Sequence, residues 1–279
     1  MTTIRANGIE IAYEEAGSKD GPVLLLVNGF TSQLISWDPK LIELLVDAGF
    51  RVITFDNRDV GLTTKTGSEP HELGTPPKYT LADMAADGMA LLTALGIERA
   101  HIVGASMGGM IVQQMAIDHP DRVLSMTSIM STTGDTSVGG ASQEAMQALL
   151  TPPPREREAN LDHAAKLWKV ISGPHYDEAK SRDRAARSYD RCFNPVGSTY
   201  QMAAIMGSGD RTEKLGHVTC PALVIHGKVD PLVGLTGGEA TARAIPGAEL
   251  LVFDDMGHDL PLPLLPDIVG AIAKLAARA

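Results

Sequence analysis

Short apolar runs that end in turn residues constrain the fold of this chain more than any other feature. Val23–Val27 is apolar throughout and ends at Asn28-Gly29, which is typical of a strand buried on both faces. Similar runs recur at 51–55, 100–103, 222–225 and 249–253, and 123–129 is a further strand candidate. Helical patterns separate the runs, among them 38–48 and 80–95. This alternation predicts an α/β fold with a mostly parallel central sheet and helices on both faces.

Two segments depart from the alternation. Residues 3–14 predict an antiparallel hairpin at the sheet edge, with its turn at Asn7-Gly8. Residues 134–215 contain no convincing strand. Their helical patterns lie at 143–150, 161–171 and 177–192. We therefore expect one α/β core, formed by residues 1–133 and 216–279, with 134–215 as a helical cap insertion.

Charge and cysteine content restrict the partners. The net charge is −10, from 24 basic and 34 acidic residues. Nucleic acids and anionic membranes require a concentrated basic face, so this balance disfavours both.

The two cysteines, Cys192 and Cys220, are too few for a disulfide framework or a structural zinc site. No run approaches the roughly 18 apolar residues of a membrane helix, and no apolar signal segment opens the chain. We expect a cytoplasmic protein with no membrane span, of undetermined oligomeric state.

The strongest local motif is Gly104-Ala105-Ser106-Met107-Gly108, which follows a predicted strand and opens a predicted helix. A serine on so sharp a strand-to-helix turn projects its hydroxyl above the sheet. Gly104 and Gly108 remove side chains that would collide where strand and helix approach each other. A glycine-rich turn without chemistry is the alternative interpretation, and the strand–turn–helix context disfavours it.

A serine nucleophile needs a base, and the base needs a third group to orient it. Among the eight histidines, His258 is best placed, because it follows the last predicted strand at the sheet edge where Ser106 emerges. Asp230 follows the preceding predicted strand after a short turn. The order Ser106, Asp230, His258 is the one expected for a nucleophile elbow of this kind.

Other candidates fit less well. His119 lies at the far end of the helix that Ser106 opens, and His226 ends a strand and is interpreted as a structural hydrogen-bonding residue. Asp254 and Asp255 come too soon before His258. Asp135, from an earlier strand, remains the alternative acid.

Together these motifs resemble the α/β-hydrolase superfamily over essentially the whole chain, and within it the bacterial esterases that include aclacinomycin methylesterase-like enzymes. The resemblance also rests on 27–30 and 56–61. It implies an oxyanion hole formed by the backbone N–H groups of Phe30 and Met107. The family usually has His-Gly where this chain has Asn28-Gly29, and a serine where it has Thr63. Asn28 can still hydrogen-bond nearby backbone.

The resulting hypothesis is ester hydrolysis through an acyl-enzyme, with no metal and no organic cofactor. The expected partner is a small-molecule ester substrate. We expect uncharged, apolar esters, because the arginines at 155, 157 and 182–191 lie in the predicted cap, where solvated faces are the expected location. Deleting residues 150–195 should then reduce selectivity before it reduces reaction with small activated esters.

Thioesterase, lactonase, perhydrolase or C–C hydrolase activity on the same three residues remains open, as does a ligand receptor on a retained hydrolase scaffold.

Overall fold

An eight-stranded sheet forms the centre of the part of the chain described by the structure, a computed structural model covering residues 2–72 and 74–279. The strand order is β1-β2-β4-β3-β5-β6-β7-β8. The strands are β1 (Thr2–Ala6), β2 (Ile9–Ala16), β3 (Val23–Val27), β4 (Arg51–Phe55), β5 (Ala100–Ala105), β6 (Val123–Ile129), β7 (Ala222–Gly227) and β8 (Glu249–Phe253). β2 is antiparallel to β1 and β4, and the other pairs are parallel. The mostly parallel sheet and the edge hairpin are both confirmed.

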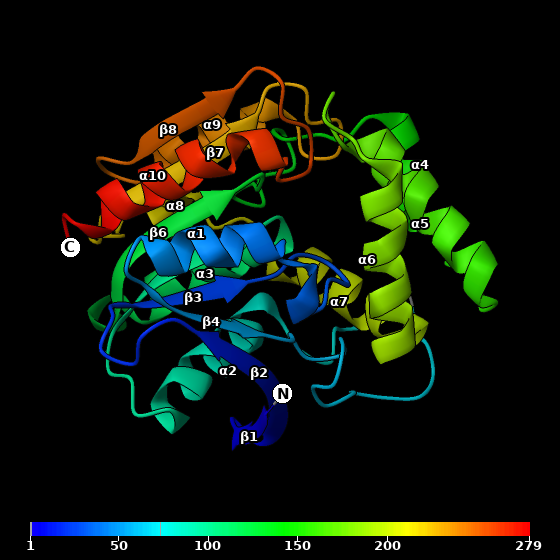
Figure 1. Cartoon of the computed structure of the whole chain (residues 1–279), viewed down its shortest axis with the longest axis horizontal. Helices are drawn as coiled ribbons and strands as arrows, with labels where there is room; N and C mark the ends of the chain where they lie inside the picture. Colours follow the sequence, from blue (N-terminus) through cyan, green and yellow to red (C-terminus); the bar gives the residue numbers. More distant parts are fainter. Residues whose placement is uncertain (1, 73) are drawn as a thin grey trace.

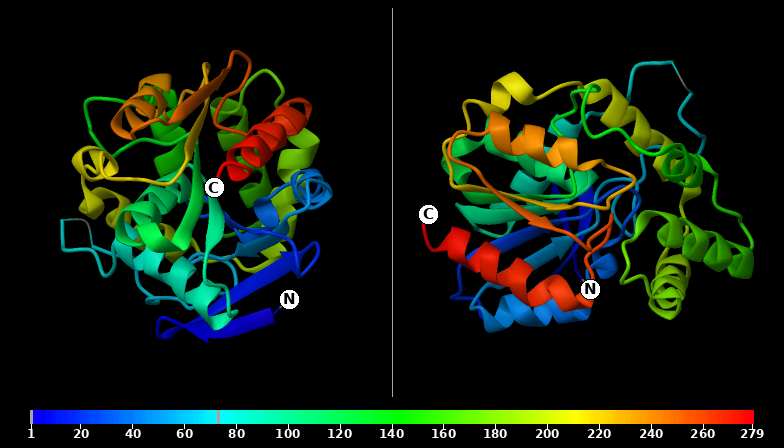
Figure 2. Two further views of the ribbon diagram at one scale, coloured as in Figure 1. Left: turned by 90° about the vertical axis from the view of Figure 1, so that its left-hand side faces the viewer. Right: turned by 90° about the horizontal axis from the view of Figure 1, so that it is seen from above.

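Helices cover both faces of the sheet (Figures 1 and 2). One face carries α1 (Pro39–Asp47) and α10 (Leu265–Ala276), and the other carries α2 (Leu81–Ala94), α3 (Met107–Asp118) and α9 (Leu235–Ala244). Alternate residues of β3 therefore enter two separate cores. Leu25 and Val27 pack with α2 and α3, whereas Leu24 and Leu26 pack with α1 and α10. This two-sided burial explains why the run is continuously apolar.

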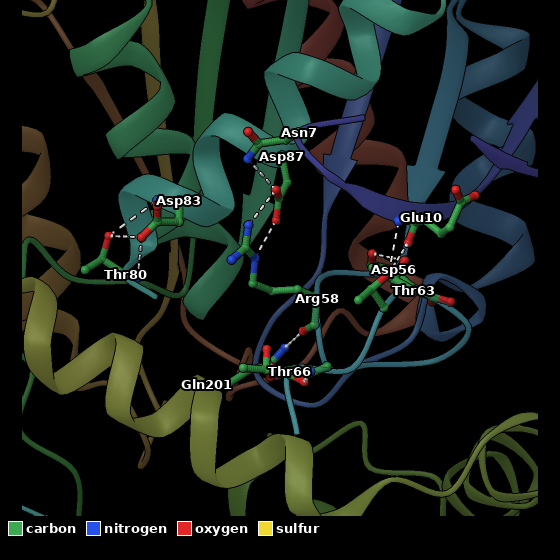
Figure 3. Close-up of polar contacts among 12 residues, drawn as sticks. Asn7, Glu10, Asp56, Arg58, Thr63, Thr66, Thr80, Asp83, Asp87 and Gln201 are labelled. Carbon is green, nitrogen blue, oxygen red and sulfur yellow. Dashed lines mark hydrogen bonds and ion pairs between the residues drawn. The ribbon is translucent and has the colours of Figure 1, made fainter. Parts of the chain in front are cut away.

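Local capping sets the start of α2. The Thr80 side chain accepts a hydrogen bond from the Asp83 amide, and the Asp83 carboxylate accepts one from the Thr80 amide (Figure 3). This reciprocal pair satisfies two amides that have no partner inside the helix. The predicted segment 80–95 is therefore the helix together with its two capping residues.

Between β6 and β7 the described chain is helical. It contains α4 (Gln143–Leu150), α5 (Arg157–Ile171), α6 (Glu178–Arg191), α7 (Pro195–Ser208) and the short α8 (Thr212–Leu215). We call α4 to α7 the cap helices. In Figure 1, α4, α5 and α6 stand beyond the edge where the parallel strands end. α5 begins four residues before the predicted start, because the Glu156 side chain caps it. The sequence pattern did not indicate α7.

The boundaries of 134–215 as a separate unit stay a prediction. None of the helices in the described part of the chain is long and apolar enough to cross a membrane.

Candidate active site

Ser106 lies at the turn between β5 and α3, in a backbone conformation that is rare for an L-residue. Its φ is 57° and its ψ is −120°, and its amide donates to the Ile129 carbonyl at 2.9 Å. A Cβ atom at Gly104 would overlap the Gly108 carbonyl, and one at Gly108 would overlap the Val27 carbonyl. Both positions therefore need glycine, since backbone atoms cannot move aside without separating α3 from the sheet. The turn is sharp for the reason expected from the motif.

The structure brings Ser106, His258 and Asp230 into one hydrogen-bonded series. His258 Nε2 lies 2.9 Å from Ser106 Oγ, and His258 Nδ1 lies 2.8 Å from Asp230 Oδ2. Both His258 and Asp230 are buried. A neutral imidazole that donates from Nδ1 to the carboxylate can accept the serine proton at Nε2. The arrangement suits activation of a hydroxyl nucleophile.

Sheet topology explains how residues so far apart in sequence meet. Ser106 follows β5, Asp230 follows β7 and His258 follows β8. The carboxyl ends of parallel strands lie at one edge, so the loops after them converge there. The other oxygen of the acid, Asp230 Oδ1, accepts from the amides of Leu232 and Val233 at 2.8 and 2.9 Å. These two amides hold the carboxylate in its orientation towards His258.

The alternative acids and bases have other partners. The Asp135 carboxylate accepts from the Ser137 amide. Asp254 pairs with Lys228, and Asp255 pairs with His175. His119 ends α3 at the opposite end from Ser106.

His226 is fully buried beside Asp230. Its Nε2–H donates to the Val233 carbonyl at 2.7 Å, in agreement with a structural hydrogen-bonding role, and the same nitrogen lies 3.7 Å from Asp230 Oδ2. Burial lowers the pKa of His226, so the ring is neutral where it braces the acid loop. A Cβ at Gly238 would overlap this ring. The contact with Asp230 was not foreseen from the sequence.

The loop after β3 passes directly beside the nucleophile. A Cβ built on Gly29 would lie 3.1 Å from Ser106 Cβ. Asn28 Nδ2 donates to the Gln33 carbonyl at 2.9 Å, and the Asn28 carbonyl accepts from Asn57 Nδ2 at 3.0 Å. Asn28 thus supports the loop through backbone contacts, as expected.

The two predicted oxyanion donors occupy suitable places. Phe30 belongs to the loop after β3, and Met107 is the first residue of α3, where amides have no acceptor inside the helix. The positive end of the helix dipole also points towards Ser106. Their use as an oxyanion hole stays a prediction.

The sequence did not point to Thr31 of this loop or to Gln201, which contacts it. Thr31 has a positive φ of 58°, and its amide donates to Gln201 Oε1 at 2.8 Å. Gln201 lies on α7, is fully buried, and donates from Nε2 to the Arg58 carbonyl at 3.0 Å (Figure 3). Periodicity could not single it out, because α7 itself was not predicted.

Arg58 and Asp59 tie loops together, as interpreted from the sequence. The Arg58 guanidinium makes two hydrogen bonds, of 2.6 and 2.7 Å, to the Asp87 carboxylate on α2 (Figure 3). The Asp59 carboxylate accepts from the amide and hydroxyl of Thr66. Thr63 donates its hydroxyl to the Asp56 carbonyl.

The cap arginines correct one expectation. Arg157, Arg182 and Arg187 are in exposed ion pairs, as expected. Arg191 is not solvated, because it pairs with the fully buried Asp56 at 2.8 Å and donates to Gln33 Oε1 at 2.6 Å. The terminal residue of α6 therefore joins the cap helices to the core.

No group of three or more His, Cys, Asp or Glu side chains suited to a metal ion occurs within residues 2–72 and 74–279. Cys192 and Cys220 are free thiols.

The chain is similar to known proteins in sequence and in structure. The chain is 29% identical over 277 residues to the rhodomycin D methylesterase DnrP of Streptomyces peucetius, covering 91% of this chain and 90% of that protein. It is 26% identical over 275 residues to a 2-hydroxy-6-oxononadienedioate/2-hydroxy-6-oxononatrienedioate hydrolase of a Pseudomonas species, covering 92% and 88%. The enol-lactonase of Burkholderia xenovorans LB400 superposes with a TM-score of 0.76 at 22% identity, over 99% of this chain and 100% of that one. Residues 22–263 match the model of the alpha/beta hydrolase fold family, and the chain belongs to that family.

Proposed function

We propose that this α/β hydrolase cleaves carboxylic esters, with Ser106 as nucleophile, His258 as general base and Asp230 as the orienting acid. The observation that carries the proposal is the hydrogen-bonded series from Ser106 Oγ through His258 to Asp230. The similarity to methylesterases over nine-tenths of the chain supports an ester as the substrate.

Each group has a defined task. Ser106 Oγ attacks the ester carbonyl while its proton passes to His258 Nε2, and Asp230 stabilises the resulting imidazolium. The Phe30 and Met107 amides stabilise the oxyanion, a contribution typically worth about 100- to 1000-fold per donor. His258 then protonates the departing alkoxide, which leaves as the alcohol. Water repeats the sequence against the acyl-enzyme, releasing the carboxylic acid and restoring Ser106.

The substrate proposal is a neutral, apolar ester, and Arg184 provides its sharpest test. The Arg184 guanidinium stacks on the Trp168 ring at 3.9 Å, and no carboxylate lies in salt-bridge range of it among the described residues. Burial lowers the pKa of Arg184 to about 10. kcat/KM should favour neutral over carboxylated esters of matched length. The reverse preference, abolished by Arg184→Met, would replace the proposed substrate class with an anionic one.

The relatives indicate which alternative reactions should be tested. The curated C–C hydrolase and the solved enol-lactonase share this fold, so carbon–carbon and lactone substrates belong in the same panel. Thioesters and hydrogen peroxide test the thioesterase and perhydrolase alternatives. A ligand receptor would react with an activated ester once, or very slowly, instead of turning it over.

The decisive experiment is Ser106→Ala. This variant should fold normally and lose hydrolysis by about 10⁴-fold or more, because nucleophile and base act as a unit. An organophosphonate should label wild type at Ser106 and leave the variant unlabelled. Labelling of another serine would overturn the assignment. Asp230→Asn should also inactivate, whereas Asp135→Asn serves as the matched control.

A further inference from the structure

The loop of residues 28–33, which we call the Phe30 loop, is attached to the cap helices as well as to the core. On the core side, Asn57 Nδ2 donates to the Asn28 carbonyl, while Asn28 Nδ2 closes the loop on the Gln33 carbonyl. On the cap side, the Thr31 amide donates to Gln201 of α7. Both attachments reach the backbone of the loop, so both restrict where the Phe30 N–H lies.

A second cap contact holds the far end of the loop. Gln33 Nε2 donates to the carbonyls of Ser188 and Cys192, at 2.7 and 2.9 Å, at the carboxyl end of α6. Arg191 donates to Gln33 Oε1 and pairs with the buried Asp56. A small cavity of about 40 Å³ lies at this contact, lined by residues that include Thr31, Gln33 and Asn194.

The backbone conformation of Thr31 indicates that the contact with Gln201 holds the loop in an unfavourable conformation. A β-branched residue at φ 58° is unfavourable, typically by about 1–3 kcal/mol, and persists only where surrounding contacts impose it. The bond to Gln201 is the contact that reaches the Thr31 amide. Gln201 is in turn fixed by the Arg58 carbonyl, and Arg58 is fixed by Asp87 (Figure 3).

We propose that Gln201 is a positioning residue for ester hydrolysis, which orients the Phe30 N–H for the oxyanion by holding the adjacent Thr31 peptide. The inference rests on the proposed function. It makes the cap helices part of the catalytic frame, which changes the outcome expected from deleting residues 150–195. Removing them also removes the α6 contacts to Gln33, so turnover of even small activated esters should fall.

The test replaces Gln201 and counts active sites independently of rate. Gln201→Met keeps the length of the side chain and removes both hydrogen bonds. Gln201→Glu keeps an acceptor for the Thr31 amide. Titration to completion with an organophosphonate gives the number of competent Ser106 sites, and kcat for a small activated ester is expressed per titrated site. This normalisation removes any unfolded fraction from the comparison.

Thr199→Val is the matched control on the same helix. The Thr199 hydroxyl accepts from the His71 amide at 2.8 Å, a cap–core bond that does not involve the Phe30 loop. It should leave kcat per site within about twofold of wild type, whatever it does to the melting temperature.

The expected result for Gln201→Met is a fall in kcat per site of about 10- to 100-fold, less than the loss of an oxyanion donor. KM and the acidic limb of the pH profile should stay unchanged, because substrate binding and His258 are untouched. Gln201→Glu should recover most of the loss. If Gln201→Met does not fold, Gln33→Met tests the second cap contact, with about a tenfold fall expected.

A kcat per site equal to that of Thr199→Val would overturn the inference and leave Gln201 as a residue that only stabilises the fold. A change in the pH profile in place of kcat would also overturn it, because the triad would then be what had moved. Failure of wild type to be titrated at Ser106 is a different outcome, which removes the proposed function itself.

Discussion

Helix α3 begins directly after Ser106 and α6 contacts Gln33 of the Phe30 loop, yet the two helices are held in place by different forces. α3 buries nine of its 12 residues, packed between α2 and the sheet. α6 buries only Ser181 among its 14 residues, and its carboxyl end is anchored by polar bonds to Gln33 and Asp56. The elbow therefore rests on apolar packing over a large surface, whereas α6 depends on a few directional contacts.

This difference has consequences for mutation. Apolar packing spreads the attachment over many side chains, and it is disturbed most where backbone atoms are forced apart. A buried ion pair concentrates the attachment in two side chains, and removal of either leaves an uncompensated charge. His258 is also held by a directional contact with a cap helix, since its amide donates to the carbonyl of Ile171 at the end of α5.

The largest effect is expected at the core side, from Gly108→Ala. The added methyl group would overlap the Val27 carbonyl, so α3 and β3 would have to separate. We expect a loss of more than about 4 kcal/mol in the free energy of unfolding, measured by denaturant titration. Gly270→Ala on α10 is the control, because nothing lies within 4 Å of its Cβ. It should stabilise by about 0.5–1 kcal/mol. Equal stability of the two variants would contradict the close packing at the elbow.

An intermediate effect is expected at the cap side, from Arg191→Met. Asp56 is fully buried, so loss of its partner should cost about 3 kcal/mol. Arg187→Met on the same helix breaks only an exposed pair with Asp183 and should cost less than about 1 kcal/mol. Thermal unfolding followed by circular dichroism measures both. If the two variants have the same melting temperature, the cap helices are not anchored through Arg191.

The smallest effect concerns pH and a core histidine on β5. Burial lowers the pKa of His101, whose Nδ1 lies 2.8 Å from Ser125 Oγ. The unfolded chain therefore binds a proton more readily than the folded one between the lowered pKa and about 6.5. The contribution to stability is fully present above about pH 6.5 and declines as the pH falls.

His101→Asn, which cannot titrate, should reduce the fall in melting temperature between pH 7 and pH 5. His217→Asn is the control, because His217 is exposed in the folded chain. A steeper pH dependence in His101→Asn would show that the sign is wrong.

The sequence by itself determined the α/β architecture, because burial on two faces produces continuous apolar runs whose length and spacing can be read directly. β3, β4 and β6, which are buried almost throughout, have the predicted bounds, and so does the edge strand β8, although its Leu250 and Val252 are exposed. The elbow was recognisable for a similar reason: its glycines are adjacent in sequence to the serine they serve. Ser106, Asp230 and His258 could be proposed from chain order, since each follows a strand of one parallel sheet.

Only the tertiary structure decided how the cap helices meet the core. Gln201 and Thr31 are 170 residues apart, and Gln33 binds carbonyls more than 150 residues away. Backbone carbonyls and amides are present at every residue, so no local pattern marks the ones that a distant glutamine will bind. Arg191 illustrates the limit, because it lies on the same helix as the exposed Arg187 and only the position of Asp56 makes it a buried anchor. Directional bonds between distant segments depend on the fold that brings those segments together, and the fold is established by apolar burial.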